Sequence, residues 1–156
     1  VTIELPVTAF FPGSYVPPGR AKIEVYRRLS SLKTVDQMRD FETELRDRFG
    51  PIPDEARRLL DLQELQILSR LWQINRIHLE DGYLTFTYDD LKYMNLLKGR
   101  VKGKLRIVDN RQACIPLKDP NPNPVSLLKT LKRILRPYAV GTAASIEASS
   151  PAEGAA

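Results

Sequence analysis

Hydrophobic positions in the first part of the chain recur at helical intervals. Those that form the first stripe are Ala21, Val25, Leu29 and Leu32. Their spacings of four, four and three residues place them on one face of a helix, which the pattern predicts over residues 19–32. Before this helix, an alternating run at residues 2–5 predicts a short strand. A connector rich in proline and glycine separates the strand from the helix.

A second helix is predicted from Thr34 to Phe49. Thr34 suits the N-cap position, and Gln37 follows it at the spacing of a capping box. Gly50 is the residue type that commonly follows the last helical residue, and Pro51 comes directly after it. The helix therefore has a start signal and a stop signal of its own.

The third predicted helix, over residues 54–72, differs from the first two because it is apolar nearly all round. Pro53 precedes it, and the carboxylates of Asp54 and Glu55 in its first turn suit the helix dipole. A helix that is apolar on several sides is buried on several sides. We therefore expect this helix to form the centre of the core.

The second half of the chain changes to strand patterning. Residues 74–79 and 83–88 are rich in Ile, Tyr, Thr and Phe, and the turn between them contains Asp81 and Gly82. This combination predicts a β-hairpin.

Further along, Asp89 or Asp90 is expected to cap a short helix that runs through Leu97 and ends at Gly99. Two more strand-like runs and a last amphipathic helix follow, at residues 104–109, 113–117 and 125–135. The expected fold is an α+β domain with about five helices, two short β-hairpins and an N-terminal strand, built around the central helix near residues 54–72.

The length of 156 residues suits one domain with its own hydrophobic core, which we place at residues 1–140. Residues 141–156 are small and polar, and we expect this tail to be disordered. The chain opens with Val1 rather than Met. We therefore interpret it as part of a longer protein.

Composition limits the cellular setting. No apolar run approaches the roughly 18 residues that a membrane span needs, and no signal-peptide pattern opens the chain. The single cysteine, Cys114, cannot form an internal disulfide. Both features are typical of a cytoplasmic protein.

The familiar catalytic motifs are absent from the sequence. It contains no phosphate-binding glycine loop, dinucleotide fingerprint or nucleophile elbow. Its single histidine, His78, lies in a predicted strand, and one histidine with one cysteine cannot close a zinc site without two carboxylates. Asp89 and Asp90 are more typical of a helix cap than of an acid/base pair. We predict a non-catalytic domain without catalytic, metal-binding or cofactor-binding residues of its own.

The net charge of +5 arises from the second half of the chain, because the first half is balanced. Part of this basic excess alternates along one segment, at Lys98, Arg100, Lys102, Lys104 and Arg106. On an extended strand the alternation places all five charges on one face. Such a row would attract a nucleic-acid phosphate backbone, or it would mark an edge strand whose charges prevent unwanted pairing. The sequence leaves both interpretations open.

Four carboxylates lie on the second predicted helix, opposite its apolar stripe. They are Asp36, Asp40, Glu44 and Asp47. Their spacings of four, four and three align them along one face, where like charges cost roughly 0.2–0.5 kcal/mol per pair. A basic partner would offset that cost, and a solvated face relieved by neighbouring arginines is the alternative. Glu42 falls inside the apolar arc, and the pattern offers no reason for it.

Three motifs make residues 1–75 resemble the C-terminal domain of bacterial transcription-repair coupling factors. They are Tyr-Val-Pro at 15–17, Tyr-Arg-Arg-Leu at 26–29 and Glu-Leu-Arg-Asp-Arg-Phe-Gly-Pro-Ile-Pro at 44–53. The last motif is the most specific. Beyond residue 75 the resemblance rests on the order of the elements.

This resemblance implies a parent protein that is an ATP-dependent DNA translocase, which removes stalled RNA polymerase and recruits the repair protein UvrA. ATP and magnesium would bind to a motor outside this chain, so no cofactor is expected within it. In the family, the C-terminal domain docks on a UvrB-like N-terminal module of the same polypeptide and masks its UvrA-binding surface. Acidic residues of the Glu-Leu-x-Asp-Arg-Phe-Gly helix make this contact, and they match Glu44 and Asp47 here. Asp40 and Asp36, on the same face, are further candidates.

Overall fold

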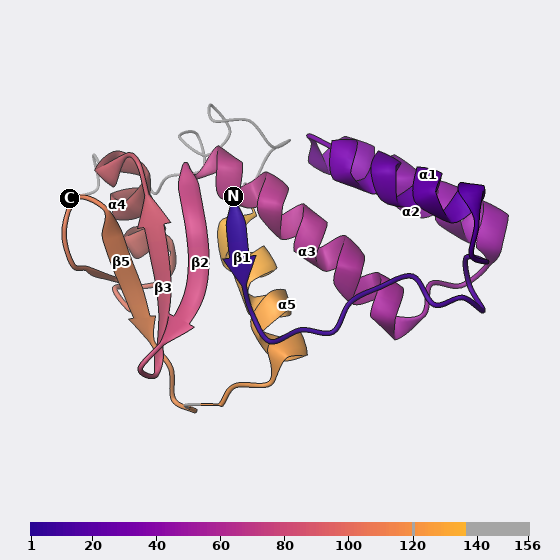
Figure 1. Ribbon diagram of the computed structural model, residues 1–156. Helices are drawn as coiled ribbons and strands as arrows, with labels where there is room; N and C mark the ends of the chain where they lie inside the picture. Colours follow the sequence, from indigo (N-terminus) through magenta and orange to yellow (C-terminus); the bar gives the residue numbers. More distant parts are fainter. Residues whose placement is uncertain (120, 137–156) are drawn as a thin grey trace.

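A computed structural model describes residues 1–119 and 121–136 of the chain (Figure 1). Its elements in chain order are β1 (Thr2–Glu4), α1 (Arg20–Ser31), α2 (Val35–Phe49), α3 (Asp54–Leu71), β2 (Ile74–Glu80), β3 (Tyr83–Tyr88), α4 (Leu91–Arg100), β4 (Arg106–Ile107), β5 (Gln112–Pro116) and α5 (Pro124–Leu135). Within the described residues this is the predicted α+β fold, with five helices and one five-stranded sheet. The predicted disordered tail at 141–156 lies outside them.

The sheet and the first two helices lie at opposite ends of the molecule, and α3 runs between them (Figure 1). Each end has its own cluster of buried hydrophobic residues. Helix α3 contributes to both: Leu65 and Leu68 pack in the cluster under the sheet, and Ala56, Leu60 and Ile67 pack against α1 and α2. The prediction of a central helix buried on several sides is confirmed. In the described part of the chain, no helix combines the length and the apolar character that crossing a membrane requires.

The sheet has the strand order β1-β2-β3-β5-β4, in which β1 runs parallel to β2 and every other neighbouring pair is antiparallel. Asp81 and Gly82 both have positive φ angles, 50° and 80°, as the tight turn of the β2–β3 hairpin requires. Strands β4 and β5 also pair directly, so both predicted hairpins are present. They join into one sheet because β3 pairs with β5 on its free side.

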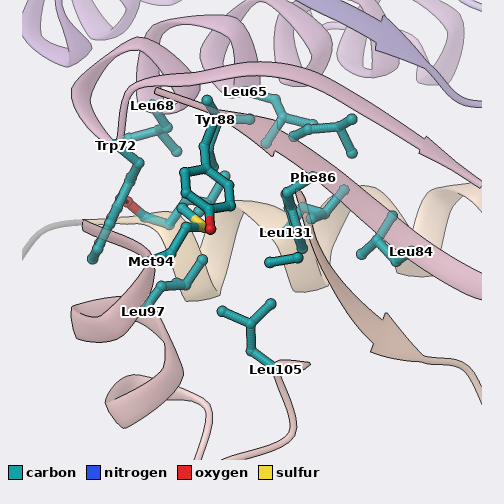
Figure 2. Packing of buried hydrophobic residues seen from close by; sticks show 14 of the residues in the cluster. Leu65, Leu68, Trp72, Leu84, Phe86, Tyr88, Met94, Leu97, Leu105 and Leu131 are labelled. Carbon is teal, nitrogen blue, oxygen red and sulfur yellow. Dashed lines mark hydrogen bonds between the residues drawn. The ribbon is translucent and has the colours of Figure 1, made fainter. Parts of the chain in front are cut away.

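One face of the sheet packs on helices α3, α4 and α5 (Figure 1). Figure 2 shows the residues that meet there, among them Leu84, Phe86 and Tyr88 of β3 with Leu65, Leu68 and Leu131 of the helices. Trp72, at the end of α3, is fully buried and its indole N–H donates to the carbonyl of Leu135 at 2.5 Å. This bond ties the end of the last helix to the central one.

The signals predicted for α2 act as caps in the structure. The Thr34 hydroxyl accepts a hydrogen bond from the backbone N–H of Gln37 at 3.1 Å. The Gln37 side chain reaches back to the N–H of Lys33 at 2.7 Å, one residue before the N-cap. Gly50 follows the helix with a φ of 91°, a conformation that glycine adopts most readily.

The two tyrosines of the sequence motifs fix the proline-rich connector to this helix pair. The Tyr15 hydroxyl donates to the carbonyls of Gly50 at 3.0 Å and Leu45 at 3.3 Å. The Tyr26 hydroxyl accepts from the N–H of Phe11 at 2.9 Å. Tyr15 therefore holds the C-terminal end of α2 to the connector, and Tyr26 holds the connector to α1.

Candidate interaction surface on helix α2

The apolar stripe of α2 contains the buried residues Met38, Phe41 and Leu45. The opposite face of the helix is therefore turned outward. The four carboxylates of the sequence pattern lie on that outward face: Asp36, Asp40 and Asp47 are exposed, and the Glu44 side chain is 38% exposed. We call these four residues, Asp36, Asp40, Glu44 and Asp47, the acidic face. The predicted geometry of the acidic face is therefore present.

Glu44 already has a cationic neighbour within the domain. The guanidinium of Arg28, from α1, forms an ion pair with its carboxylate and lies 5.3 Å from the ring centroid of Phe41. The hydrogen bond from Arg28, and then the Arg28 charge, lower the pKa of Glu44. The Arg28 side chain is 48% exposed, so solvent screens this pair and its contribution to stability is small.

The other members of the acidic face differ in how far they are neutralised. Asp36 lies 3.8 Å from Arg39 on the same helix, a contact at the outer limit of an ion pair. Among the described residues, Asp40 and Asp47 make no ion pair. Asp47 also lies in the last turn of α2, where the helix dipole disfavours an anion. Asp40 and Asp47 are therefore the two carboxylates most available to a partner.

A surface hollow of about 280 Å³ opens beside the acidic face, between α1 and α2. Its lining consists of Arg28, Ser31, Leu32, Gln37, Asp40, Phe41 and Glu44. It thus brings together the Arg28–Glu44 ion pair and the unpaired carboxylate of Asp40.

Glu42, which had no explanation in the sequence pattern, faces inward and joins α2 to α3. Its carboxylate lies 2.8 Å from Arg46 and 2.5 Å from Arg57. Desolvation raises the pKa of Glu42, but the hydrogen bond from Arg57 and the charges around it outweigh that effect and the net pKa is lowered. Glu42 is therefore a structural residue and does not belong to the acidic face.

A second group of charges joins α3 to α5. The Lys132 ammonium lies 2.8 Å from Asp61, which is only 5% exposed, and 2.9 Å from Glu64. Burial lowers the pKa of Lys132, but its hydrogen bonds to these two carboxylates outweigh burial and raise it. Arg136 pairs with Glu64 from the end of α5 at 3.2 Å. Sequence reasoning missed this group, although a carboxylate inside a nearly all-apolar helix was a signal for it.

The candidates for chemistry do not come together in a site. His78 is buried in the sheet, with Nε2 3.1 Å from the carboxylate of Glu80. Asp90 caps α4 by accepting from the N–H of Lys92, and Asp89 accepts from the side chain of Asn75. Over residues 1–119 and 121–136, no group of three or more His, Cys, Asp or Glu side chains could hold a metal ion.

The expected basic row on one extended face is wrong. Lys98 and Arg100 belong to α4, which continues through Gly99; Lys102 and Lys104 lie in the turn after it, and Arg106 begins β4. The N–H of Gly103 bonds to the carbonyl of Lys98 at 3.0 Å, and Lys102 adopts a φ of 56°. These are the features of a helix-ending turn, which breaks the alternation of sides that an extended segment would have.

The fold and this surface define a class: a mixed α+β domain that presents a charged helix face. The chain belongs to the TRCF domain family, because the model of that family matches residues 5–98. The resemblance noted in the sequence is therefore confirmed.

Its curated relatives are named transcription-repair-coupling factors. The chain is similar to those of Staphylococcus epidermidis, at 39% identity, and Staphylococcus aureus, at 40% identity, over 67 residues in each case. The matched segment is 43% of this chain and 6% of each relative. A crystal structure of the C-terminal domain of a transcription-repair coupling factor shares the fold, with a TM-score of 0.72 and 18% identity over 97% of this chain and 94% of that one.

Proposed function

We propose that this chain is the non-catalytic, autoinhibitory docking domain at the C-terminal end of a transcription-repair coupling factor. It binds through the acidic face to the UvrB-like N-terminal module of the same polypeptide and masks the surface that UvrA binds. The parent protein is a cytoplasmic, ATP-dependent DNA translocase that acts on stalled RNA polymerase. Its ATP and magnesium bind to a motor outside this chain.

The observation that carries this proposal is the state of Asp40 and Asp47. Both are exposed on the outward side of a helix held firmly by its buried stripe, and neither has an ion-pair partner in the described residues. A guanidinium on a facing surface would relieve the repulsion along the helix and can bind a carboxylate through two hydrogen bonds. The family membership of the chain supports the choice of partner.

The energetics suit a contact that opens readily. Exposed ion pairs contribute only about 0–1 kcal/mol each, so a face with two to four of them is weak by itself. Tethering to the same polypeptide raises the effective concentration to roughly millimolar, which favours the closed form without a strong interface. A closed state only a few kcal/mol deep can then be opened by a competing ligand.

A direct test is an NMR titration of the 156-residue chain with the UvrB-like module of its parent at low and high salt, carried to roughly millimolar concentration because the untethered contact is weak. We expect binding at low salt that weakens as salt screens the ion pairs. Reversal of Asp40 and Asp47 to Arg should abolish binding, while Glu80→Arg, with a 62% exposed carboxylate on the distant sheet, should leave it unchanged. Equal binding by all three proteins would contradict the proposal.

A second candidate function is nucleic-acid binding around the end of α4. The supporting observation is that Lys98, Lys102 and Lys104 are exposed and make no ion pair within the described residues. They are close along the chain around one helix-ending turn, so phosphate contact is chemically reasonable. Filter binding of duplex DNA at two salt concentrations tests it: micromolar affinity with a steep salt dependence favours this function over docking.

A further inference from the structure

We infer that the hollow between α1 and α2 is a guanidinium-binding site whose resident guanidinium is the domain's own Arg28. An arginine of a docking partner would enter by displacing Arg28 from Glu44. The identity of that partner rests on the proposed function, whereas the site itself rests on the contacts that follow.

Arg28 occupies the hollow through two contacts. Its guanidinium pairs with the Glu44 carboxylate and lies 5.3 Å from the Phe41 ring centroid, the distance at which a cation interacts with an aromatic face. Asp40 lines the same hollow from the preceding turn of α2. An aromatic side wall with two carboxylates at its rim is a setting that suits a planar cation.

The chemistry favours a guanidinium over an ammonium. A guanidinium is planar, stacks on an aromatic ring and presents several N–H groups in a fixed fork, so one group can reach carboxylates on successive helical turns. A lysine ammonium is a compact and strongly hydrated charge that gains less from such a wall. The hollow should therefore distinguish arginine from lysine.

The Arg28–Glu44 pair is also accessible to exchange. Its two side chains are 48% and 38% exposed, so the pair is screened and easily broken. A partner arginine would replace one ion pair of Glu44 with another, and would gain the unpaired carboxylate of Asp40 in addition. Arg28 thus acts as an internal competitor that lowers the affinity of the acidic face for an arginine of the docking partner. By the strength of exposed ion pairs, its removal should tighten binding of an incoming arginine by up to about fivefold.

The probe for this site is N-acetyl-arginine amide, titrated into the 156-residue chain and followed by the NMR shifts of the Phe41 ring and the Glu44 side chain. Arg28→Ala should bind the probe more tightly than the unmodified chain, and N-acetyl-lysine amide should bind less well to that variant. Arg27→Ala is the matched control, because Arg27 is an exposed neighbour without an ion pair among the described residues. Circular dichroism checks folding, and Arg28→Gln replaces Arg28→Ala if the latter unfolds.

Three results would overturn the inference: equal probe binding by Arg28→Ala and the unmodified chain, the same gain in Arg27→Ala, or binding retained in Arg28→Ala/Glu44→Gln. The failure of the proposed function is distinguishable. In that case Arg28→Ala still binds N-acetyl-arginine amide more tightly than the unmodified chain. In the parent protein, however, neither Arg28→Gln nor Asp47→Arg changes the affinity for UvrA. If both ideas hold, Arg28→Gln closes the parent further and Asp47→Arg opens it.

Discussion

Glu42 of helix α2 and Arg57 of helix α3 form an ion pair that joins these two helices. The Glu42 carboxylate also binds Arg46 on its own helix, so a single side chain is held from both elements. Together with the buried stripe of α2, this ion pair sets the orientation of the helix about its axis. It thereby turns the acidic face outward, where a partner can reach it.

Replacement of Glu42 by Gln should destabilise the domain by about 1–2 kcal/mol, because it removes charge-assisted hydrogen bonds at a partly buried position. Urea unfolding measures this loss, with Asp40→Asn as the matched control that should change the free energy of unfolding little. An equal effect in the two variants would mean that Glu42 does not join the helices.

The contribution of Glu42 should also depend on pH. Its folded pKa lies below the ordinary value of 4.5, so its stabilisation is fully present above that value and is lost as pH falls through the folded pKa. The difference in unfolding free energy between the unmodified chain and Glu42→Gln should therefore be constant near neutral pH and shrink below about pH 4.5. A difference that grows towards acid pH would contradict the assignment.

Lys132→Met should cost about 2–4 kcal/mol, because it leaves the Asp61 and Glu64 carboxylates largely buried without their shared cation. The double variant Lys132→Met/Asp61→Leu should recover part of that loss, since it removes the unpaired Asp61 carboxylate while Glu64 keeps its ion pair with Arg136. Thermal unfolding of the three proteins measures both effects. Lys129→Met, on the exposed side of α5, serves as the control for loss of a lysine.

Tyr15→Phe removes the hydrogen bonds that the connector makes with the end of α2. We expect a loss of about 1 kcal/mol in the free energy of unfolding, with little change in core packing. Hydrogen exchange at the last turn of α2 should increase, because its carbonyls lose an anchoring donor. An unchanged exchange rate there would show that the motif tyrosine does not hold this turn.

Lys102→Gly should stabilise the domain by about 0.5–1 kcal/mol, because a φ of 56° strains a residue with a side chain. Lys104→Gly is the matched control and should bring no such gain, because Lys104 is not among the residues with positive φ. If the lysines after α4 bind nucleic acid, Lys102→Gly would gain stability and lose DNA affinity together. Gain of stability alone would favour the docking function.

The sequence predicted the helix caps and the tight turn correctly, because a single residue type determines the backbone conformation at these positions. Thr34, Gly50 and the Asp81-Gly82 turn act in the structure as their types predict, because caps and tight turns depend on near neighbours. The periodicity of α2 likewise predicted the outward direction of the acidic face, since a helix fixes the angle between successive side chains.

The pairing of charges across the fold was not predictable in this way. Arg28 reaches Glu44 from another helix, and Lys132 reaches Asp61 across 71 positions of sequence. Glu42 and Asp61 are carboxylates inside apolar stripes, but their positions in the sequence do not indicate Arg57 and Lys132 as their partners. The basic segment at 98–106 failed for a different reason. Its alternation suits a strand, but packing of Leu97 and Leu105 into the core keeps a helix and a turn there.

The central claim, that the acidic face closes the parent protein on itself, is tested most directly by the affinity of the full-length parent for UvrA. We would measure it for the unmodified parent, for Asp40→Arg/Asp47→Arg and for Glu80→Arg, which reverses a single carboxylate at a distant exposed site. The account predicts that the double reversal binds UvrA at least about tenfold more tightly, which corresponds to about 1.4 kcal/mol of lost closure, and that Glu80→Arg binds as the unmodified protein does. Equal affinity of all three proteins for UvrA would contradict it.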